Sequence, residues 1–261
     1  MRKIGLEELK RIQLEILNDV HTFCVGHGIR YSLAYGTLLG AVRHQGYIPW
    51  DDDIDIMMPR PDYERFLQEY ESKDNEAVDC RKLDTCIETF TKVCRKHSAM
   101  TDVAWGRTLW GINIDVFPMD GCPEDAEAFY VAVRKKYREL ARLCPLYKVV
   151  KRNKLLWWLK YAVKRVVFFY PHSFMHKKIE LVTLERHCNF KETGLAWHSG
   201  CQRAVEASVL SNYIDIQFEG MQYKSVLDYD AYLKVAFGDY MKLPPIEQRV
   251  LPHQYDAYIL D

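Results

Sequence analysis

Apolar residues near the start of the chain recur every three or four positions between Leu6 and Phe23. This spacing gathers them on one face of a helix. Gly26 and Gly28 follow the last apolar position, and glycine commonly ends a helix. The pattern predicts an amphipathic helix that packs on a sheet beginning at Tyr31.

The next segment changes from the period of a strand to that of a helix. From Tyr31 to Tyr35, apolar residues alternate with small or polar ones, as in a half-buried strand. Gly36 and Thr37 interrupt the alternation before a short apolar helix expected over residues 38–42. A glycine at such a turn lets the backbone approach a ligand, and the amides at a helix start suit a phosphate. The segment is therefore predicted to bind an anion, to which Thr37 can add its hydroxyl.

A run of aspartates begins at Asp51. In its second half, charged and apolar residues alternate up to Met58, which is the period of a strand. Asp53 and Asp55 are then expected to face one cleft, with Asp51 in the same parity, while the isoleucines between and after them enter the core. Oxygen ligands at about 2.1 Å are what Mg²⁺ requires, so the run predicts a magnesium site.

An acidic surface turn that also caps a helix is the alternative for this run. Crowded carboxylates repel one another unless a cation or a proton intervenes. An exposed turn also gives no reason for the apolar residues 54–58 that follow. The pattern favours the metal site.

A second carboxylate stands among β-formers in the strand expected over Gly111–Phe117. Asp115 is there a candidate ligand, and a partly exposed strand residue is the alternative. The segment Pro118–Gly121 is expected to stop the strand at once. Asp120 is interpreted as a turn residue or as the cap of the next helix.

The remaining patterns predict a scaffold of helices and short strands. Helices are expected after Pro59 to about Glu71, over 123–144 and 173–190, and between Asp228 and Gly238; strands over 77–83, 89–95, 100–103 and 213–218, with a hairpin at 218–223. The expected organisation is a core over 1–122, a helical region over 123–190 and a C-terminal part over 191–261 that completes the substrate pocket, all in one compact unit.

The segment 151–170 has its own character, because basic residues lie opposite an apolar face with aromatic residues at the border. Such a helix can lie on a membrane surface. Lys160, Lys164 and Arg165 interrupt it too often for a good spanning helix. An ordinary amphipathic helix packed on the domain is the alternative.

Composition narrows the classes of partner and compartment. Hydrophobic residues make up 48% of the 261 residues, which is enough for a buried core, and 36 basic residues balance 36 acidic ones. This balance argues against nucleic acid as a partner. Eight cysteines without a C-x-x-C pair, and an N-terminus without an apolar signal segment, lead us to expect a cytoplasmic protein, with a place at the inner face of the membrane if the segment 151–170 binds lipid.

Two neighbouring segments, YGTLLGAVRH over 35–44 and IPWDDDID over 48–55, resemble the signature of the LicD family, relatives of fukutin in the nucleotidyltransferase superfamily. A block from Asp228 to Pro245, with Arg249 and His253 downstream, resembles the same family. The resemblance implies an α/β (α+β) fold with a nucleotidyltransferase-like mixed sheet flanked by helices and an added helical region. It also implies transfer of a phospho-alcohol, typically phosphocholine, from a CDP-activated donor to a hydroxyl of a sugar or lipid-linked glycan.

The resemblance assigns expected roles to individual residues. Mg²⁺ or Mn²⁺ is expected on the catalytic carboxylates Asp53, Asp55 and Asp115, which Asp51 can join. Asp115 is also the candidate to orient or deprotonate the acceptor hydroxyl. The donor phosphates are expected at Gly36, Thr37 and Arg43, and the substrate pocket at His44, Trp50, Tyr240, Arg249 and His253.

Several alternatives stay open at this point. Arg43 can be a solvated residue at a helix end. A choline group would need aromatic faces, for which Trp50, Trp105, Trp110 and Tyr240 are available. A nucleotidyltransferase that releases pyrophosphate would use the same carboxylates, and a non-catalytic relative would only bind a nucleotide.

Overall fold

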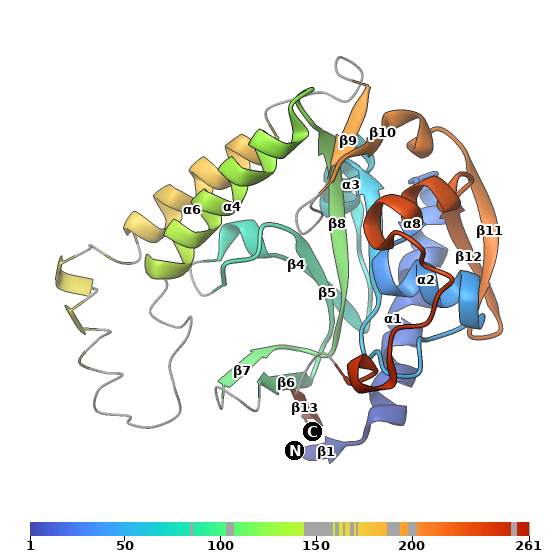
Figure 1. Ribbon diagram of the computed structural model, residues 1–261. Coiled ribbons are helices and arrows are strands. Elements are labelled where there is room, and N and C mark those ends of the chain that lie inside the picture. Colours follow the sequence, from blue (N-terminus) through green and yellow to red (C-terminus); the bar gives the residue numbers. More distant parts are fainter. Residues whose placement is uncertain are drawn as a thin grey trace.

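A computed structural model describes residues 1–83, 86–102, 107–143, 159, 162–163, 165–167, 170, 172–186, 194–197, 203–251 and 255–260. A mixed sheet with helices around it dominates these residues (Figure 1). The predicted α/β architecture is confirmed.

The seven-stranded sheet among the described residues runs in the order β10-β9-β8-β3-β2, and β5 joins β8 and β4 joins β5 outside this path. Only the pairing of β3 with β8 is parallel within it; every other pair is antiparallel. The strands are β2 (Ser32–Leu33), β3 (Asp55–Pro59), β4 (Asn75–Asp79), β5 (Thr91–Arg95), β8 (Asn113–Gly121), β9 (Leu195–Trp197) and β10 (Val205–Glu206).

Strand β8 changes partner along one of its edges. Residues 113–116 pair with β5, whereas Asp120 and Gly121 pair with β9. Its other edge pairs with β3 from Asp115 to Met119. The sheet therefore has an opening beside the middle of β8, between the two partners.

The expected end of this strand at Pro118 was wrong. Asp115 donates its N–H to Ile54 on the β3 side, and alternate residues of a strand point their N–H groups to opposite edges. Pro118 therefore turns its nitrogen toward the edge where β8 has no partner, so the missing N–H costs no ladder hydrogen bond. The strand continues through the proline to Gly121.

The expected role of Asp120 was also wrong. Its side chain is 4% exposed, in the strand, and accepts from both Nε and a terminal nitrogen of Arg60, at 2.7 and 2.5 Å. This paired contact ties the helix after β3 to the end of β8. Asp120 is a structural residue and neither a turn residue nor a cap.

The helices are α1 (Leu6–His27), α2 (Tyr35–His44), α3 (Arg60–Glu69), α4 (Ala126–Leu143), α6 (His172–Glu185) and α8 (Tyr229–Phe237), with short 3-10 turns at Cys80–Lys82, Ala207–Leu210 and Ile246–Gln248. Helix α1 ends as predicted at Gly28, whose φ of 63° is the left-handed conformation that glycine favours. The predicted cap of α8 is confirmed, because the Asp228 side chain accepts from the N–H of Ala231.

Two smaller sheets complete the chain. A four-stranded sheet contains β1 (Arg2–Ile4), β13 (Tyr255–Ile259), β6 (Ser98–Asp102) and β7 (Arg107–Trp110), in that order. It places the two ends of the chain side by side (Figure 1). The predicted hairpin is formed by β11 (Tyr213–Phe218) and β12 (Met221–Val226).

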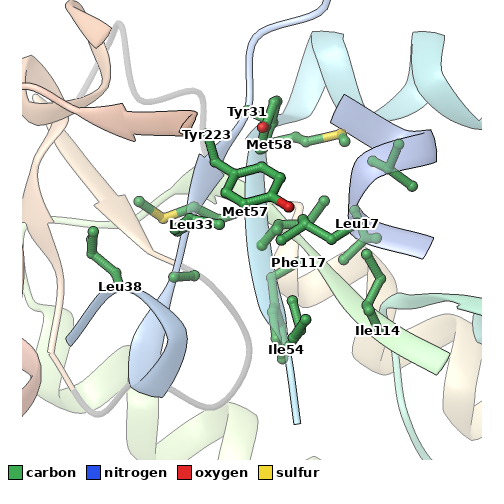
Figure 2. Close-up of a cluster of buried hydrophobic side chains, with 14 of the residues drawn as sticks. Leu17, Tyr31, Leu33, Leu38, Ile54, Met57, Met58, Ile114, Phe117 and Tyr223 are labelled. Atoms are coloured by element: carbon green, nitrogen blue, oxygen red, sulfur yellow. The ribbon is translucent and has the colours of Figure 1, made fainter. Parts of the chain in front are cut away.

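Apolar residues gather in two clusters. The larger one joins the N-terminal helix, the central strands and the C-terminal hairpin, as with Leu17, Ile54, Ile114 and Tyr223 in Figure 2. The smaller one lies between α4 and α6 and includes Trp197; the two helices pack side by side on one flank of the sheet (Figure 1). The boundaries near 122 and 190 stay a prediction.

Most of the segment 151–170 lies outside the described residues. Among the residues described there, Leu159, Val163, Val166 and Val167 are 47–74% exposed, whereas Tyr170 is buried in the smaller cluster. Among the described residues no helix has the length and apolarity that crossing a bilayer requires.

Candidate functional site

Asp55 and Asp115 are direct neighbours across the parallel pair β3 and β8. Asp55 is the first residue of its strand, directly after the buried Ile54, whose carbonyl accepts the N–H of Asp115. Side chains opposite each other on paired strands lie on the same face. The sequence predicted that these two carboxylates lie close together, and the register of the sheet confirms this prediction.

The other aspartates of the run reach the site by a different route from the one predicted. Residues 51–54 precede β3 and are not in a strand, so a strand parity does not apply to them. Carboxylate oxygens of Asp51, Asp52 and Asp53 lie within 4.8 Å of one another. Asp52, to which the sequence pattern assigned no role, is thus part of the same acidic group, which consists of Asp51, Asp52, Asp53, Asp55 and Asp115.

Helix α2 fixes the start of β3. The helix begins earlier than predicted. Tyr35, with a φ of 40°, is its first residue, so Gly36 and Thr37, which were expected to form the turn before the helix, lie in its first turn. The buried Thr37 hydroxyl accepts the N–H of Asp55 at 2.8 Å. A side chain at Gly36 would collide with the carboxylate of Asp51. Thr37 therefore fixes the position of Asp55, and the lack of a side chain at Gly36 leaves room for Asp51.

Lys92 on β5 is a functional candidate that the sequence did not reveal. Its ammonium donates to Asp115 Oδ1 at 2.5 Å, and the side chain is 12% exposed. Burial alone would lower the pKa of Lys92, but the charge and hydrogen bond of Asp115 raise it above its usual value. The lysine stays charged beside the carboxylates. Its position depends on the pairing of Lys92 with Asp115 across two strands, which no local pattern encodes.

The acidic group carries more negative charge than Lys92 balances. Burial, and then the charges of Asp53, Asp115 and Asp51, raise the pKa of Asp55 well above its usual range. Burial and the neighbouring Asp53 raise the pKa of Asp51 to about 7. Burial raises the pKa of Asp115 in spite of Lys92. A divalent cation with oxygen ligands is the partner that would relieve this repulsion, so the residues fit Mg²⁺ or Mn²⁺.

A cavity of about 450 Å³ adjoins this group. Asp53, Asp55 and Asp115 form part of its wall. The cavity lies at the opening beside β8, because it is lined by residues before β5, on β8 and on β9, together with residues of α4 and α6. A smaller cavity of about 100 Å³ also touches Asp53 and Asp115 and contains Lys92. Asp53 and Asp115 therefore line both cavities.

Arg43, predicted to bind the donor phosphates, and four of the predicted substrate-pocket residues form a second group. We call it the arginine cluster: Arg43, His44, Trp50, Tyr240 and Arg249. Arg43 donates to the Tyr240 carbonyl at 2.6 Å and to His44 Nε2 at 3.0 Å. The guanidinium carbon of Arg249 lies 5.3 Å from the centre of the Trp50 ring. Burial and the charge of Arg249 lower the pKa of Arg43. His253 lies outside the described residues.

Two arginines held close together are a receptor for an anion. The cluster adjoins the acidic group along the chain, because Trp50 directly precedes Asp51. Arg43 is tied down by its two hydrogen bonds, so the alternative of a solvated residue at a helix end does not describe it. Five residues picked from separate motifs are therefore brought together by the fold.

The aromatic residues considered for choline lie at two different places in the described part of the chain. Trp50 and Tyr240 belong to the arginine cluster, Trp110 lines the smaller cavity, and Trp105 lies outside the described residues. The larger cavity is lined instead by six aromatic residues that the sequence analysis had not chosen for this role: Tyr35, Phe90, Phe117, Tyr130, Tyr137 and Trp197. They come from five separate parts of the chain, so no motif contains them.

Comparison with known proteins bears on this arrangement. The model of the LicD/FKTN/FKRP nucleotidyltransferase domain matches residues 28–130. The chain is 31% identical over its whole length, and over the whole length of the relative, to the lipopolysaccharide cholinephosphotransferase LicD of Haemophilus influenzae. An uncharacterized protein of Rickettsia typhi is 41% identical over 26% of this chain and 22% of its own length. One of Rickettsia prowazekii is 34% identical over 34% of this chain and 37% of its own length.

Proposed function

The chain belongs to the LicD family, and from that membership we propose that it transfers phosphocholine from a CDP-activated donor to a sugar hydroxyl of a cell-surface glycan or its lipid-linked precursor. The observation that carries the proposal is the convergence of Asp53, Asp55 and Asp115 at the mouth of a large cavity, in a relative of a lipopolysaccharide cholinephosphotransferase.

The donor needs two kinds of contact, and each group of residues supplies one. Arg43 and Arg249 can bind the phosphates or the leaving nucleotide, together with the backbone amides of Gly36 and Thr37 at the start of α2. Asp53, Asp55 and Asp115 would hold the metal, and Asp51 could join them. Bound there, Mg²⁺ would neutralise charge on the pyrophosphate.

The reaction then depends on positioning and electrostatics. The acceptor hydroxyl attacks the phosphorus that carries the alcohol, and CMP departs. Asp115 orients the hydroxyl or accepts its proton, and Lys92 fixes the Asp115 carboxylate by its hydrogen bond at 2.5 Å. The phosphorus bearing choline forms a bond to the acceptor oxygen as its bond to the CMP oxygen breaks.

Incubation with CDP-choline, CDP-ribitol and CDP-glycerol in turn, each with Mg²⁺, tests the proposal. We expect CMP from CDP-choline and little from the other two. EDTA should stop the release. Pyrophosphate released from CTP in the presence of a phospho-alcohol would instead support the nucleotidyltransferase, and binding without any turnover would support a non-catalytic relative.

We further propose that the segment 151–170 contacts the inner face of an anionic membrane. Leu159, Val163, Val166 and Val167 are exposed to solvent, by up to 74% at Val166, while Tyr170 at the end of the segment is buried. The basic residues of the segment suit an anionic surface. Replacing Lys160, Lys164 and Arg165 together by Gln should abolish co-sedimentation with phosphatidylglycerol vesicles at low salt and leave CMP release unchanged. Wild-type protein that stays in the supernatant at low salt would refute the contact.

A further inference from the structure

The larger cavity holds two acidic side chains that the proposed metal site does not use. Glu88 lies just before β5, and Glu185 is the last residue of α6. The Glu185 side chain is 5% exposed, and its hydrogen bond to Thr89 only partly offsets the burial, which raises its pKa to about 8. A buried carboxylate is costly unless a cation or a proton accompanies it. Arg134, the one basic side chain among the described lining residues, is exposed at the edge.

The rest of the cavity wall is aromatic. The rings of Tyr35 and Phe117 meet edge to face with their centres 5.3 Å apart, and the ring centres of Phe117 and Phe90 are 4.4 Å apart. The face of Phe90 already receives a cation, because the ammonium of Lys92 lies 5.2 Å from its centre. Tyr130 and Tyr137 add rings from α4, and Trp197 adds one from β9. Aromatic faces around a space attract a cation that is too weakly hydrated to prefer water.

A carboxylate inside an aromatic wall is the arrangement that a quaternary ammonium group requires. Such a group has no N–H to donate, so ring faces and a nearby negative charge are its main attractive contacts. A cation bound in the cavity would favour the ionised form of Glu185, whereas a neutral polyol would leave Glu185 protonated and would present hydroxyls to ring faces that cannot bond them well. Size alone would not separate the two kinds of alcohol in a cavity of about 450 Å³.

We propose that this cavity is the subsite for the alcohol part of the donor and selects a quaternary ammonium group, with Glu185 and Glu88 as counter-charges and the rings of Tyr35, Phe117 and Tyr130 as its wall. The inference rests on the proposed function and deepens it. It places the choline next to Asp55 and Asp115, which line the same cavity, so that the phosphorus to be attacked lies at the acidic group.

Binding without turnover tests the subsite directly. Titration calorimetry with CDP, CDP-choline and CDP-glycerol, in Mg²⁺ at pH 7.5, separates the nucleotide from the alcohol. Wild-type protein should bind CDP-choline about tenfold or more tightly than CDP-glycerol. Glu185→Gln should remove most of this preference and leave the affinity for CDP unchanged. Glu180→Gln is the matched control, because Glu180 lies on the same helix, pairs with Lys136 and Lys177, and does not line the cavity.

A second pair of variants tests the rings without removing a charge. Tyr130 is half-buried on α4, so its replacement should leave the protein folded. Tyr130→Phe keeps the ring and should keep the preference, whereas Tyr130→Leu should lower it about three- to tenfold. Equal binding of CDP-choline and CDP-glycerol by the wild type, or an unchanged preference in both Glu185→Gln and Tyr130→Leu, would overturn the subsite. A preserved preference without CMP release would instead refute the proposed transfer and leave the subsite standing.

Discussion

The arginine cluster and the aromatic cavity adjoin the same run of aspartates and have opposite charge. On one side, Arg43 and Arg249 stand beside Trp50. On the other, Glu88 and Glu185 stand among aromatic rings. A phosphocholine donor has the matching asymmetry, with anionic phosphates at one end and a cation at the other. Under the proposed function, the aspartates between the two regions would serve a reaction whose substrate is recognised by opposite charges on its two sides.

The largest effect should come from the residues between the two regions. Asp53→Asn, Asp55→Asn and Asp115→Asn should each lower the rate of CMP release by about 10²–10³-fold, because each removes a charge that holds the metal. Asp215→Asn is the control, since Asp215 is an exposed carboxylate paired with Lys224 on the hairpin. Melting temperatures without Mg²⁺ should not fall in Asp53→Asn and Asp55→Asn, because these substitutions relieve repulsion. Asp115→Asn should melt lower, because it leaves the buried ammonium of Lys92 without its counter-charge. Near-normal turnover of any one variant would remove that residue from the site.

Substitution in the arginine cluster should affect all donors equally. Arg249→Leu removes a charge-assisted contact and should weaken CDP, CDP-choline and CDP-glycerol by about tenfold each. The preference between the two alcohols should stay the same, in contrast to Glu185→Gln. Calorimetry with the three ligands checks this. A loss confined to CDP-choline would mean that the two regions have been assigned the wrong way round.

Metal affinity should depend on pH. Asp51, with a pKa of about 7, and Asp55, with a raised pKa, must lose protons to bind Mg²⁺. Affinity should therefore fall by about tenfold between pH 8 and pH 6. Titrations in two buffers of different ionisation enthalpy should show proton release near pH 7. An affinity that is constant over this range would contradict the raised pKa values.

The smallest effect concerns the stability of the cavity wall. The pKa of Glu185 is about 8 in the folded protein, above its value when unfolded. Its contribution to stability is present at pH 4 and is lost as the pH rises through 8, because the buried carboxylate must then ionise. Glu185→Gln cannot ionise, so it should melt a few degrees above the wild type at pH 9 and close to it at pH 5. Equal melting curves at both pH values would show that Glu185 is not held neutral.

The sequence predicted what is local. The helix at Leu6 and the cap at Asp228 follow from short patterns. The residues of the arginine cluster were picked by the family resemblance, and their meeting depends on contacts between distant parts of the chain. The joining of Asp55 to Asp115 could be expected, because both are aspartates among β-formers. The continuation of β8 through Pro118 could not, since it depends on which edge of the strand lacks a partner.

The aromatic cavity was missed for the same reason. Glu185 reads as an ordinary surface residue of a helix, and Trp197 as an isolated tryptophan. They meet only because β8 exchanges β5 for β9 and α6 covers the opening. Such a site depends on the pairing of strands that are far apart in the sequence, and the spacing of residues along the chain does not reveal that pairing.

The proposed function requires attack at the phosphorus that bears the alcohol. CDP-choline incubated with the protein and Mg²⁺ in ¹⁸O-labelled water, with no sugar acceptor, allows water to take the place of the acceptor hydroxyl. Mass spectrometry of the products then shows which phosphorus gained the oxygen. We expect label in phosphocholine and none in CMP, whereas label in CMP would mean that the nucleotide is the group transferred.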